Sequence, residues 1–171
     1  TLSSSSAASD VYKRQTHTVV SDVQALASDD AGNVWFGTGA GLWQRTISDT
    51  WSSFNTNDNI VDLALDGDGN IWMAVANAGL RVYLTGGEWL TYTAANSDLL
   101  TDTVTGLAVD GQGQVWVGYG AAATGASVLS ADRLVWSHVS PDETGMEAVN
   151  VLVQSAAGDV WLGGDGDWGA S

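Results

Sequence analysis

Gly32-Asn33-Val34-Trp35 is a four-residue motif, called the Trp phrase below, that recurs three more times in this sequence with small changes. The other copies are Gly69-Asn70-Ile71-Trp72, Gly113-Gln114-Val115-Trp116 and Gly158-Asp159-Val160-Trp161. Successive tryptophans of the phrase are 37, 44 and 45 residues apart. Twelve residues before each of them stands a β-branched residue that opens a stretch of spaced apolar residues, namely Val23, Ile60, Val104 and Val149. A unit that recurs every ~40–45 residues is typical of stacked β-rich repeats, above all of propeller blades.

Each complete unit contains four short segments of β type. The second segment is the Trp phrase, and its apolar residues are consecutive, as in Val34-Trp35-Phe36, which indicates a central strand buried on both faces. A short turn such as Asp29-Asp30-Ala31-Gly32 precedes it. An Asp or Ser starts this turn by accepting backbone hydrogen bonds, and the final Gly supplies the positive φ that closes a hairpin. We therefore predict four-stranded antiparallel meanders whose turns close at Gly32, Gly69, Gly113 and Gly158.

The predicted fold is an all-β β-propeller of about three and a half blades in an incomplete ring. The blades are expected at about 22–57, 59–98 and 103–143, with a half blade at 148–171. Because propellers close with about four to eight blades, we interpret the chain as a fragment whose partners include the remaining blades of a longer protein. The outer faces of the first and last blades should then expose apolar surface, so that the polypeptide self-associates or unfolds easily.

Residues 1–15 do not fit the repeat, and residues 16–171 are assigned to the partial propeller. The Ser3–Ser6 run followed by two alanines is of low complexity, and we interpret the segment as a non-native or disordered leader. A rival interpretation takes Val11 and Tyr12 as the remnant of an outer strand.

The charge balance limits the classes of partner. The chain has 20 acidic and five basic residues, a net charge of −15. Such a surface repels phosphate backbones, which argues against nucleic-acid binding. No apolar run approaches the roughly 20 residues that a membrane-spanning helix needs, so no membrane segment is predicted. The chain has no cysteine, which excludes disulfides and thiolate chemistry.

The repeated tryptophans and the acidic turns invite functional interpretations that we weigh against structural ones. Sugar stacking is conceivable for Trp35, Trp72, Trp116 and Trp161, but an aromatic side chain that buries roughly 150–250 Å² is better used as core between blades. The stretch 66–70, Asp-Gly-Asp-Gly-Asn, superficially resembles a calcium loop. A calcium site needs about six to eight oxygens, normally with a later Glu that is missing here, so we interpret the stretch as a turn.

No catalytic group, metal or cofactor is predicted. The two histidines, His17 and His138, have no ligand-type partner at suitable spacing. A ligand, if there is one, is expected on the rim formed by two kinds of loop, those joining the second and third strands and those joining one blade to the next. The candidate ligand-binding residues there are Asn57, Asn77, Tyr119, Thr124 and Trp168. The alternative is that these are ordinary solvated loop residues.

The stretch from Asp22 to Leu42 resembles the two-component regulator propeller repeat. In that family an apolar strand is followed by Asp-x-x-Gly-Asn-(Leu/Ile/Val)-Trp, a hydrophobic residue, Gly-Thr, a short loop and Gly-Leu. This chain has the same order, with Asp29, Gly32 and Trp35 at the matching positions. The resemblance covers roughly residues 22–165, and departures such as Ala74-Val75 in place of Gly-Thr grow along the chain.

The resemblance implies a non-enzymatic ligand-sensing or interaction role in the periplasmic or extracellular part of a bacterial sensor protein, with a glycan, another small ligand or a protein as partner. A second resemblance, to the Asp-box of sialidase-like propellers, rests on Ser28, Asp30, Gly32 and Trp35 and is met only once. It implies a fragment of a glycan-active enzyme. A structural surface or adhesin repeat is the third alternative.

Overall fold

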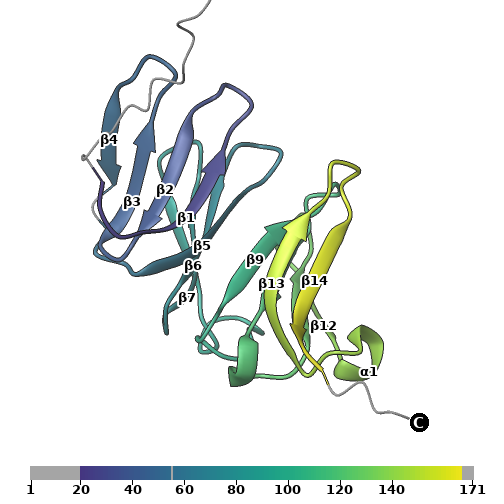
Figure 1. The fold of residues 1–171 in the computed structure, drawn as a ribbon. Helices are drawn as coiled ribbons and strands as arrows, with labels where there is room; N and C mark the ends of the chain where they lie inside the picture. Colours follow the sequence, from purple (N-terminus) through teal and green to yellow (C-terminus); the bar gives the residue numbers. More distant parts are fainter. Residues whose placement is uncertain (1–19, 55, 167–171) are drawn as a thin grey trace, which may run out of the picture.

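The computed structural model describes residues 20–54 and 56–166, which form three four-stranded sheets and one two-stranded sheet (Figure 1). Sheet one contains β1 (Val23–Ser28), β2 (Val34–Thr38), β3 (Gly41–Arg45) and β4 (Trp51–Phe54). Sheet two contains β5 (Ile60–Leu65), β6 (Ile71–Val75), β7 (Gly79–Tyr83) and β8 (Trp89–Tyr92). Sheet three contains β9 (Gly106–Val109), β10 (Val115–Gly118), β11 (Ala126–Leu129) and β12 (Trp136–Val139). Sheet four contains β13 (Ala148–Gln154) and β14 (Val160–Asp165).

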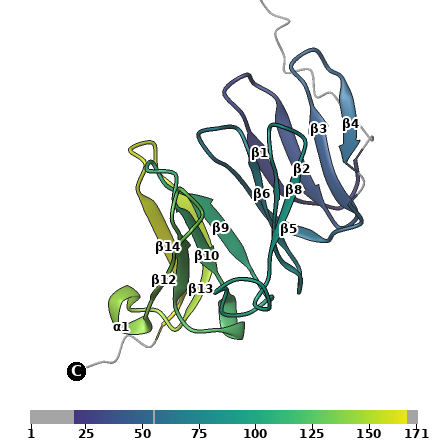
Figure 2. The same ribbon diagram turned by 180° about the vertical axis from the view of Figure 1, so that it is seen from behind.

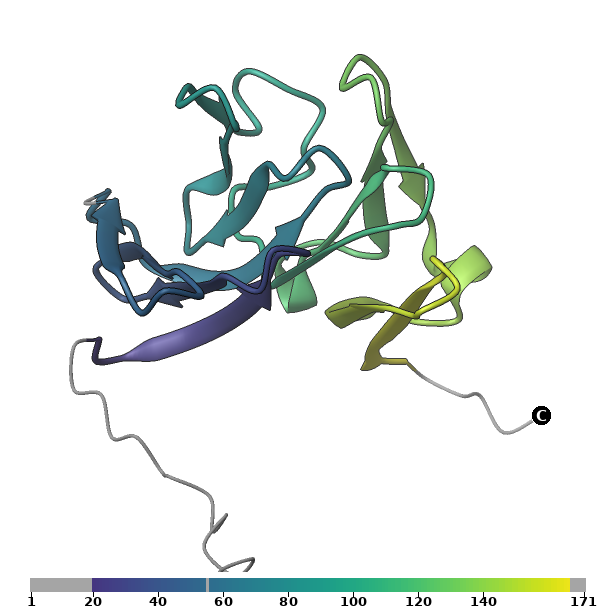
Figure 3. The same ribbon diagram turned by 90° about the horizontal axis from the view of Figure 1, so that it is seen from above.

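Every sheet is an antiparallel meander in which the strands pair in chain order. Seen from above, the four sheets follow one another along an arc that stays open between sheet four and sheet one (Figure 3). This arrangement confirms the predicted all-β class and the three and a half blades. Residues 20–54 and 56–166 contain two single-turn helices, the 3₁₀ helix Gly120–Ala122 after β10 and α1 (Pro141–Thr144) between sheets three and four (Figure 2). Among the described residues, no helix is long and apolar enough to cross a membrane.

The turns between the first and second strands form as the sequence predicts. Their closing glycines have φ values of 82°, 79°, 81° and 91° at Gly32, Gly69, Gly113 and Gly158. A side chain at such a φ costs roughly 1–2 kcal/mol, so glycine is the residue that closes these hairpins without strain.

Three hydrophobic clusters fill the spaces between neighbouring sheets. Between sheets one and two, Trp35 and Leu42 pack against Ile60 and Met73. Between sheets two and three, Trp72 packs with Leu107 and Val117, and between sheets three and four a smaller cluster forms around Val149 and Leu152. The core of the molecule is therefore the set of sheet-to-sheet interfaces, as expected for stacked blades.

The four repeated tryptophans do not share one degree of burial. Trp35 and Trp72 are 6% and 1% exposed, and Trp116 is partly buried. The prediction that Trp161 is also core between blades is wrong, because its side chain is 69% exposed. The physical reason is position: in the earlier units this side chain is covered by the next sheet, and no described sheet follows sheet four.

Candidate functional site

A large cavity lies at the end of the sheets that carries the β1–β2, β5–β6 and β9–β10 turns, which we call the turn rim. It has a volume of about 940 Å³. Its lining consists of Ser28–Ala31, Leu65–Gly69 and Val109–Gly113 from the three turns, together with Ala131, Arg133 and Gln154. The repeat thus brings three equivalent acidic turns around one space.

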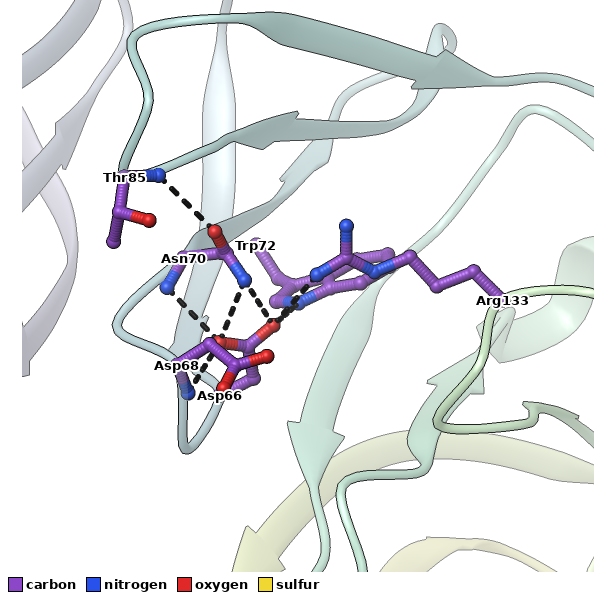
Figure 4. A network of polar contacts seen from close by, with 6 residues as sticks. All are labelled: Asp66, Asp68, Asn70, Trp72, Thr85 and Arg133. Carbon is purple, nitrogen blue, oxygen red and sulfur yellow. Dashed lines mark hydrogen bonds and ion pairs between the residues drawn. The ribbon is translucent and has the colours of Figure 1, made fainter.

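The carboxylate of Asp66 organises the middle turn (Figure 4). It accepts hydrogen bonds from the backbone N–H groups of Asp68 and Asn70, at 3.1 and 2.9 Å, and from Asn70 Nδ2 at 2.9–3.0 Å. The amide oxygen of Asn70 accepts a bond from the Thr85 N–H at 3.1 Å, which ties this turn to the β7–β8 turn. Hydrogen bonding of this kind is what fixes an Asp-initiated turn, and it supports the turn interpretation of residues 66–70.

Two further donors reach Asp66 from outside its turn. Trp72 Nε1 donates to Asp66 Oδ2 at 3.0 Å, and Arg133 Nη2 lies 3.1 Å from the same oxygen. The guanidinium carbon of Arg133 is 5.4 Å from the centre of the Trp72 ring. Because Arg133 belongs to the β11–β12 turn of sheet three, this contact joins two neighbouring sheets at the turn rim (Figure 4).

The equivalent acids of the flanking turns make fewer bonds. Asp110 accepts bonds from Gln112 N, Gln114 N, Gln114 Nε2 and Trp116 Nε1, all at 2.8–3.0 Å. Asp29 accepts bonds from the backbone and side chain of Asn33, both at 2.8 Å. Trp35 Nε1 is buried and forms no hydrogen bond of normal length, but it lies close enough to Asp29 to contribute to the lowered pKa of that carboxyl.

These three turn acids are held in the ionised form. Burial acts to raise the pKa of Asp66, but the bonds donated by Asn70 and Trp72 outweigh it and leave the pKa below its usual value. The same balance lowers the pKa of Asp110, through Trp116 and Gln114, and that of Asp29, through Asn33. Asp30 and Asp68 add two exposed carboxylates to the lining.

The cavity is therefore negatively charged at neutral pH, with one cation, Arg133, in its lining. A general acid needs a raised pKa, which the three turn acids do not have. No group of three or more His, Asp or Glu close enough to hold a metal ion occurs in residues 20–54 and 56–166. The arrangement suits the binding of a neutral or cationic molecule, since ionised carboxylates repel anions.

Most of the ligand-binding residues predicted from the sequence lie at the opposite end of the sheets, which we call the loop rim. Asn57 and Asn77 are exposed, with φ values of 54° and 55°, and Asn77 Oδ1 accepts a hydrogen bond from Thr103 Oγ1 at 3.1 Å. Thr124 is exposed after the 3₁₀ helix. None of the three lines the large cavity, and Trp168 lies outside the described residues.

The prediction that Tyr119 is a loop aromatic open to a ligand is wrong. Its side chain is 0% exposed. Its hydroxyl donates to Ser127 Oγ at 2.7 Å and accepts from the Leu100 N–H at 3.3 Å, and Ser127 Oγ lies 2.8 Å from His138 Nδ1. Tyr119 is therefore a core residue that links the end of β10 to β11 and to the loop before β9.

A second, smaller cavity of about 440 Å³ lies beside sheets one and two and was not predicted. Phe54, Thr56, Arg81, Trp89 and Thr91 line it. Trp89 is 39% exposed, and Arg81 forms an ion pair with Asp58 at 2.6 Å. The only signal in the sequence is the aromatic residue that opens each fourth strand, which does not distinguish an exposed ring from a packed one.

No protein-family model matches the sequence, and no curated protein matches it significantly. Many solved structures have the same fold. One is the extracellular domain of a protein assigned to the hybrid two component systems of B. thetaiotaomicron, with 24% identity and a TM-score of 0.66 over 85% of this chain and 21% of that one.

Another is the extracellular domain of an assigned one component system protein of the same organism, with 17% identity and a TM-score of 0.62 over 84% of this chain and 20% of that one. Virginiamycin B lyase from Staphylococcus aureus has 13% identity and a TM-score of 0.64 over 82% of this chain and 48% of that enzyme. The chain thus spans a fifth to a half of the length of these proteins. The likeness shows the propeller fold, and the two extracellular domains agree with the resemblance of the repeat.

Proposed function

We propose that this chain is part of a non-enzymatic β-propeller that senses a ligand or binds a partner in the periplasm or outside the cell. The coarse part of this proposal is supported by the two similar extracellular domains of signalling systems. The non-enzymatic part is supported by the state of the turn acids, because lowered pKa values make them poor proton donors.

The observation that carries the proposal is the cavity of about 940 Å³ at the turn rim. Its volume is that of a large ligand pocket, and its lining combines ionised carboxylates with glycine-rich backbone. We propose as ligand a neutral, hydroxyl-rich molecule such as an oligosaccharide, whose hydroxyls donate to the exposed carboxylates of Asp30 and Asp68. A uronic-acid oligomer of the same length would be repelled by the same groups.

Calorimetric titration with neutral hexasaccharides and with hexagalacturonate tests this proposal. We expect binding of at least one neutral sugar, weakened about a hundredfold or more in Asp30→Ala/Asp68→Ala, because each of the two lost hydrogen bonds to a charged acceptor is worth about 1.5–3 kcal/mol. The matched control is Asn57→Ala/Thr124→Ala on the loop rim, which should bind as the unaltered protein does.

Loss of binding in the loop-rim variant alone would move the site to the opposite end of the sheets. Equal affinity for hexagalacturonate would contradict the proposed ligand class. Because enzymes share this fold, the same samples are examined by chromatography, and cleaved sugar would refute the non-enzymatic proposal.

A further inference from the structure

The sheet-to-sheet interfaces have a direction. We call the side of a sheet that faces the next sheet in the chain its trailing face, and the other side its leading face. On the trailing face of sheet one, Ala25 and Trp35 pack against sheet two and are 8% and 6% exposed. On the leading face of sheet two, Ile60 and Leu63 meet them and are 0% and 6% exposed.

A small residue two positions after each repeated Trp forms a socket for this contact. A side chain built on Gly37 would lie 2.6 Å from Ile60 Cγ2, so Ile60 fills that socket. At the junction of sheets three and four, the socket at Gly118 is filled by Val149 and Leu152, which a Cβ there would approach to 3.1 and 2.9 Å.

The last socket is empty. Gly163 stands two residues after Trp161, and the nearest atoms to a Cβ built there, at 3.8 and 3.9 Å, belong to Val151 of its own sheet. The trailing face around it is uncovered, with Val151, Val153 and Trp161 exposed to 57%, 56% and 69%.

The matching leading face is uncovered at the other end of the arc. Val23 and Leu26 occupy on sheet one the register positions that Ile60 and Leu63 occupy on sheet two. They are 42% and 62% exposed, whereas their counterparts are buried. One molecule therefore carries both halves of an interface that it forms three times internally, and the two halves are too far apart along the arc to meet (Figure 3).

In the longer protein predicted above, the remaining blades would cover both faces. For the 171-residue chain by itself, we propose that the leading face of sheet one in a second copy docks on the trailing face of sheet four, with Val23 over Gly163 and Leu26 against Trp161. The contact is heterologous, and two copies that make it reciprocally close a ring of eight sheets, within the range of about four to eight that propellers use. The net charge of −15 on each copy opposes the contact. Association should therefore strengthen as salt screens the repulsion.

Sedimentation equilibrium of the full chain is the first test. At moderate salt we expect a species of twice the 17.7 kDa monomer mass, which dissociates on dilution or at low salt. A monomer at every concentration and salt level would overturn the proposal.

Two blocking variants make the test specific. Gly163→Val fills the empty socket without a clash inside the monomer, and Val23→Glu places a charge on the leading face. Each variant alone should be monomeric, whereas their mixture should form a one-to-one dimer through the one intact pair of faces. The control Leu134→Glu changes a side chain that is 79% exposed on the β11–β12 turn and should dimerise normally.

Circular dichroism and tryptophan fluorescence establish whether each variant is folded. If Val23→Glu does not fold, Gly163→Val alone still tests the proposal. Dimerisation of Gly163→Val at the affinity of the unaltered chain would overturn the proposal. A mixture that associates no more than either variant alone, even at the highest concentration reached, would do so too, because the mixed pair keeps one of the two contacts. So would a Leu134→Glu protein that loses dimerisation to the same extent as the blocking variants.

Discussion

Asp66→Ala and Asp29→Ala remove equivalent turn acids, yet the structure predicts very different losses of stability. Asp66 accepts hydrogen bonds from the N–H groups of its own turn and from Trp72 Nε1, and it forms an ion pair with Arg133. Its removal leaves the indole N–H of Trp72, which is 1% exposed, without an acceptor and leaves Arg133 without its partner. Breaking a buried ion pair costs about 3–5 kcal/mol. Because the Arg133 side chain keeps 23% of its surface exposed, we expect the lower end, about 3 kcal/mol.

The hydrogen bonds of 2.8 Å that Asp29 accepts both come from Asn33, and Trp35 and Ala31 interact with this carboxylate more weakly. Trp35 Nε1 forms no hydrogen bond of normal length, so Asp29→Ala removes only a weak electrostatic contact with this indole. The expected cost of Asp29→Ala is therefore about 1 kcal/mol, the typical net value of hydrogen bonds within one turn.

Urea unfolding followed by tryptophan fluorescence measures both variants at one protein concentration. The expected difference of about 2 kcal/mol corresponds to about 4–8 °C in the thermal midpoint for a chain of this size. Equal losses in the two variants would refute the reasoning, because they would mean that Trp72 and Arg133 gain nothing from Asp66. As an internal check, Asp110→Ala should fall between them, since Asp110 has a Trp partner but no Arg.

Acid should destabilise the fold through Asp66 and Asp110, whose pKa values lie below 3.8 in the folded protein. Their contribution to the free energy of unfolding is full above pH 3.8 and is lost as the pH falls through the folded pKa values. Free energies of unfolding measured across that pH range will check this. Asp62 acts in the opposite direction, because burial raises its pKa despite hydrogen bonds from the Leu107 and Leu63 N–H groups. The free energy of unfolding of Asp62→Asn should therefore fall more steeply on acidification than that of the unaltered protein. An unchanged slope of this free energy against pH would contradict the prediction. Gly79→Ala should cost more than about 2 kcal/mol, since its φ is 76° and its Cβ would clash with the Tyr92 carbonyl oxygen. The control Gly67→Ala, with open space around it, should change the thermal midpoint little.

The repeat made the sheets predictable because each strand boundary has its own local signal. Turn acids, positive-φ glycines such as Gly69 and consecutive apolar residues such as those of β6 act within one hairpin, and the sequence shows all of them. The contact of Arg133 with Asp66 spans 67 residues and depends on how two sheets pack. No spacing rule within one unit predicts it.

Two features of the rims could not be predicted from the sequence, each for a physical reason. Tyr119 departs from the repeat within a lengthened connection, which suggested an exposed loop aromatic. The 3₁₀ helix that follows it turns the chain back, and the ring is buried under β11. The sequence places a ligand on the loop rim because the loops between blades and those between second and third strands both open there, whereas the cavity of about 940 Å³ lies at the turn rim, where the repeated turns of three sheets converge.

In the first three units the indole of the repeated Trp packs toward the following sheet, and this has a bearing on how such genes evolve. A whole unit can be duplicated or deleted by recombination between copies, and every junction that results still presents Trp to the same kind of counterpart. Lineages can therefore change the number of units without redesigning any contact. Point mutations at Ile60 or Gly37, which act on a single junction, would be harder to tolerate than the loss of forty residues.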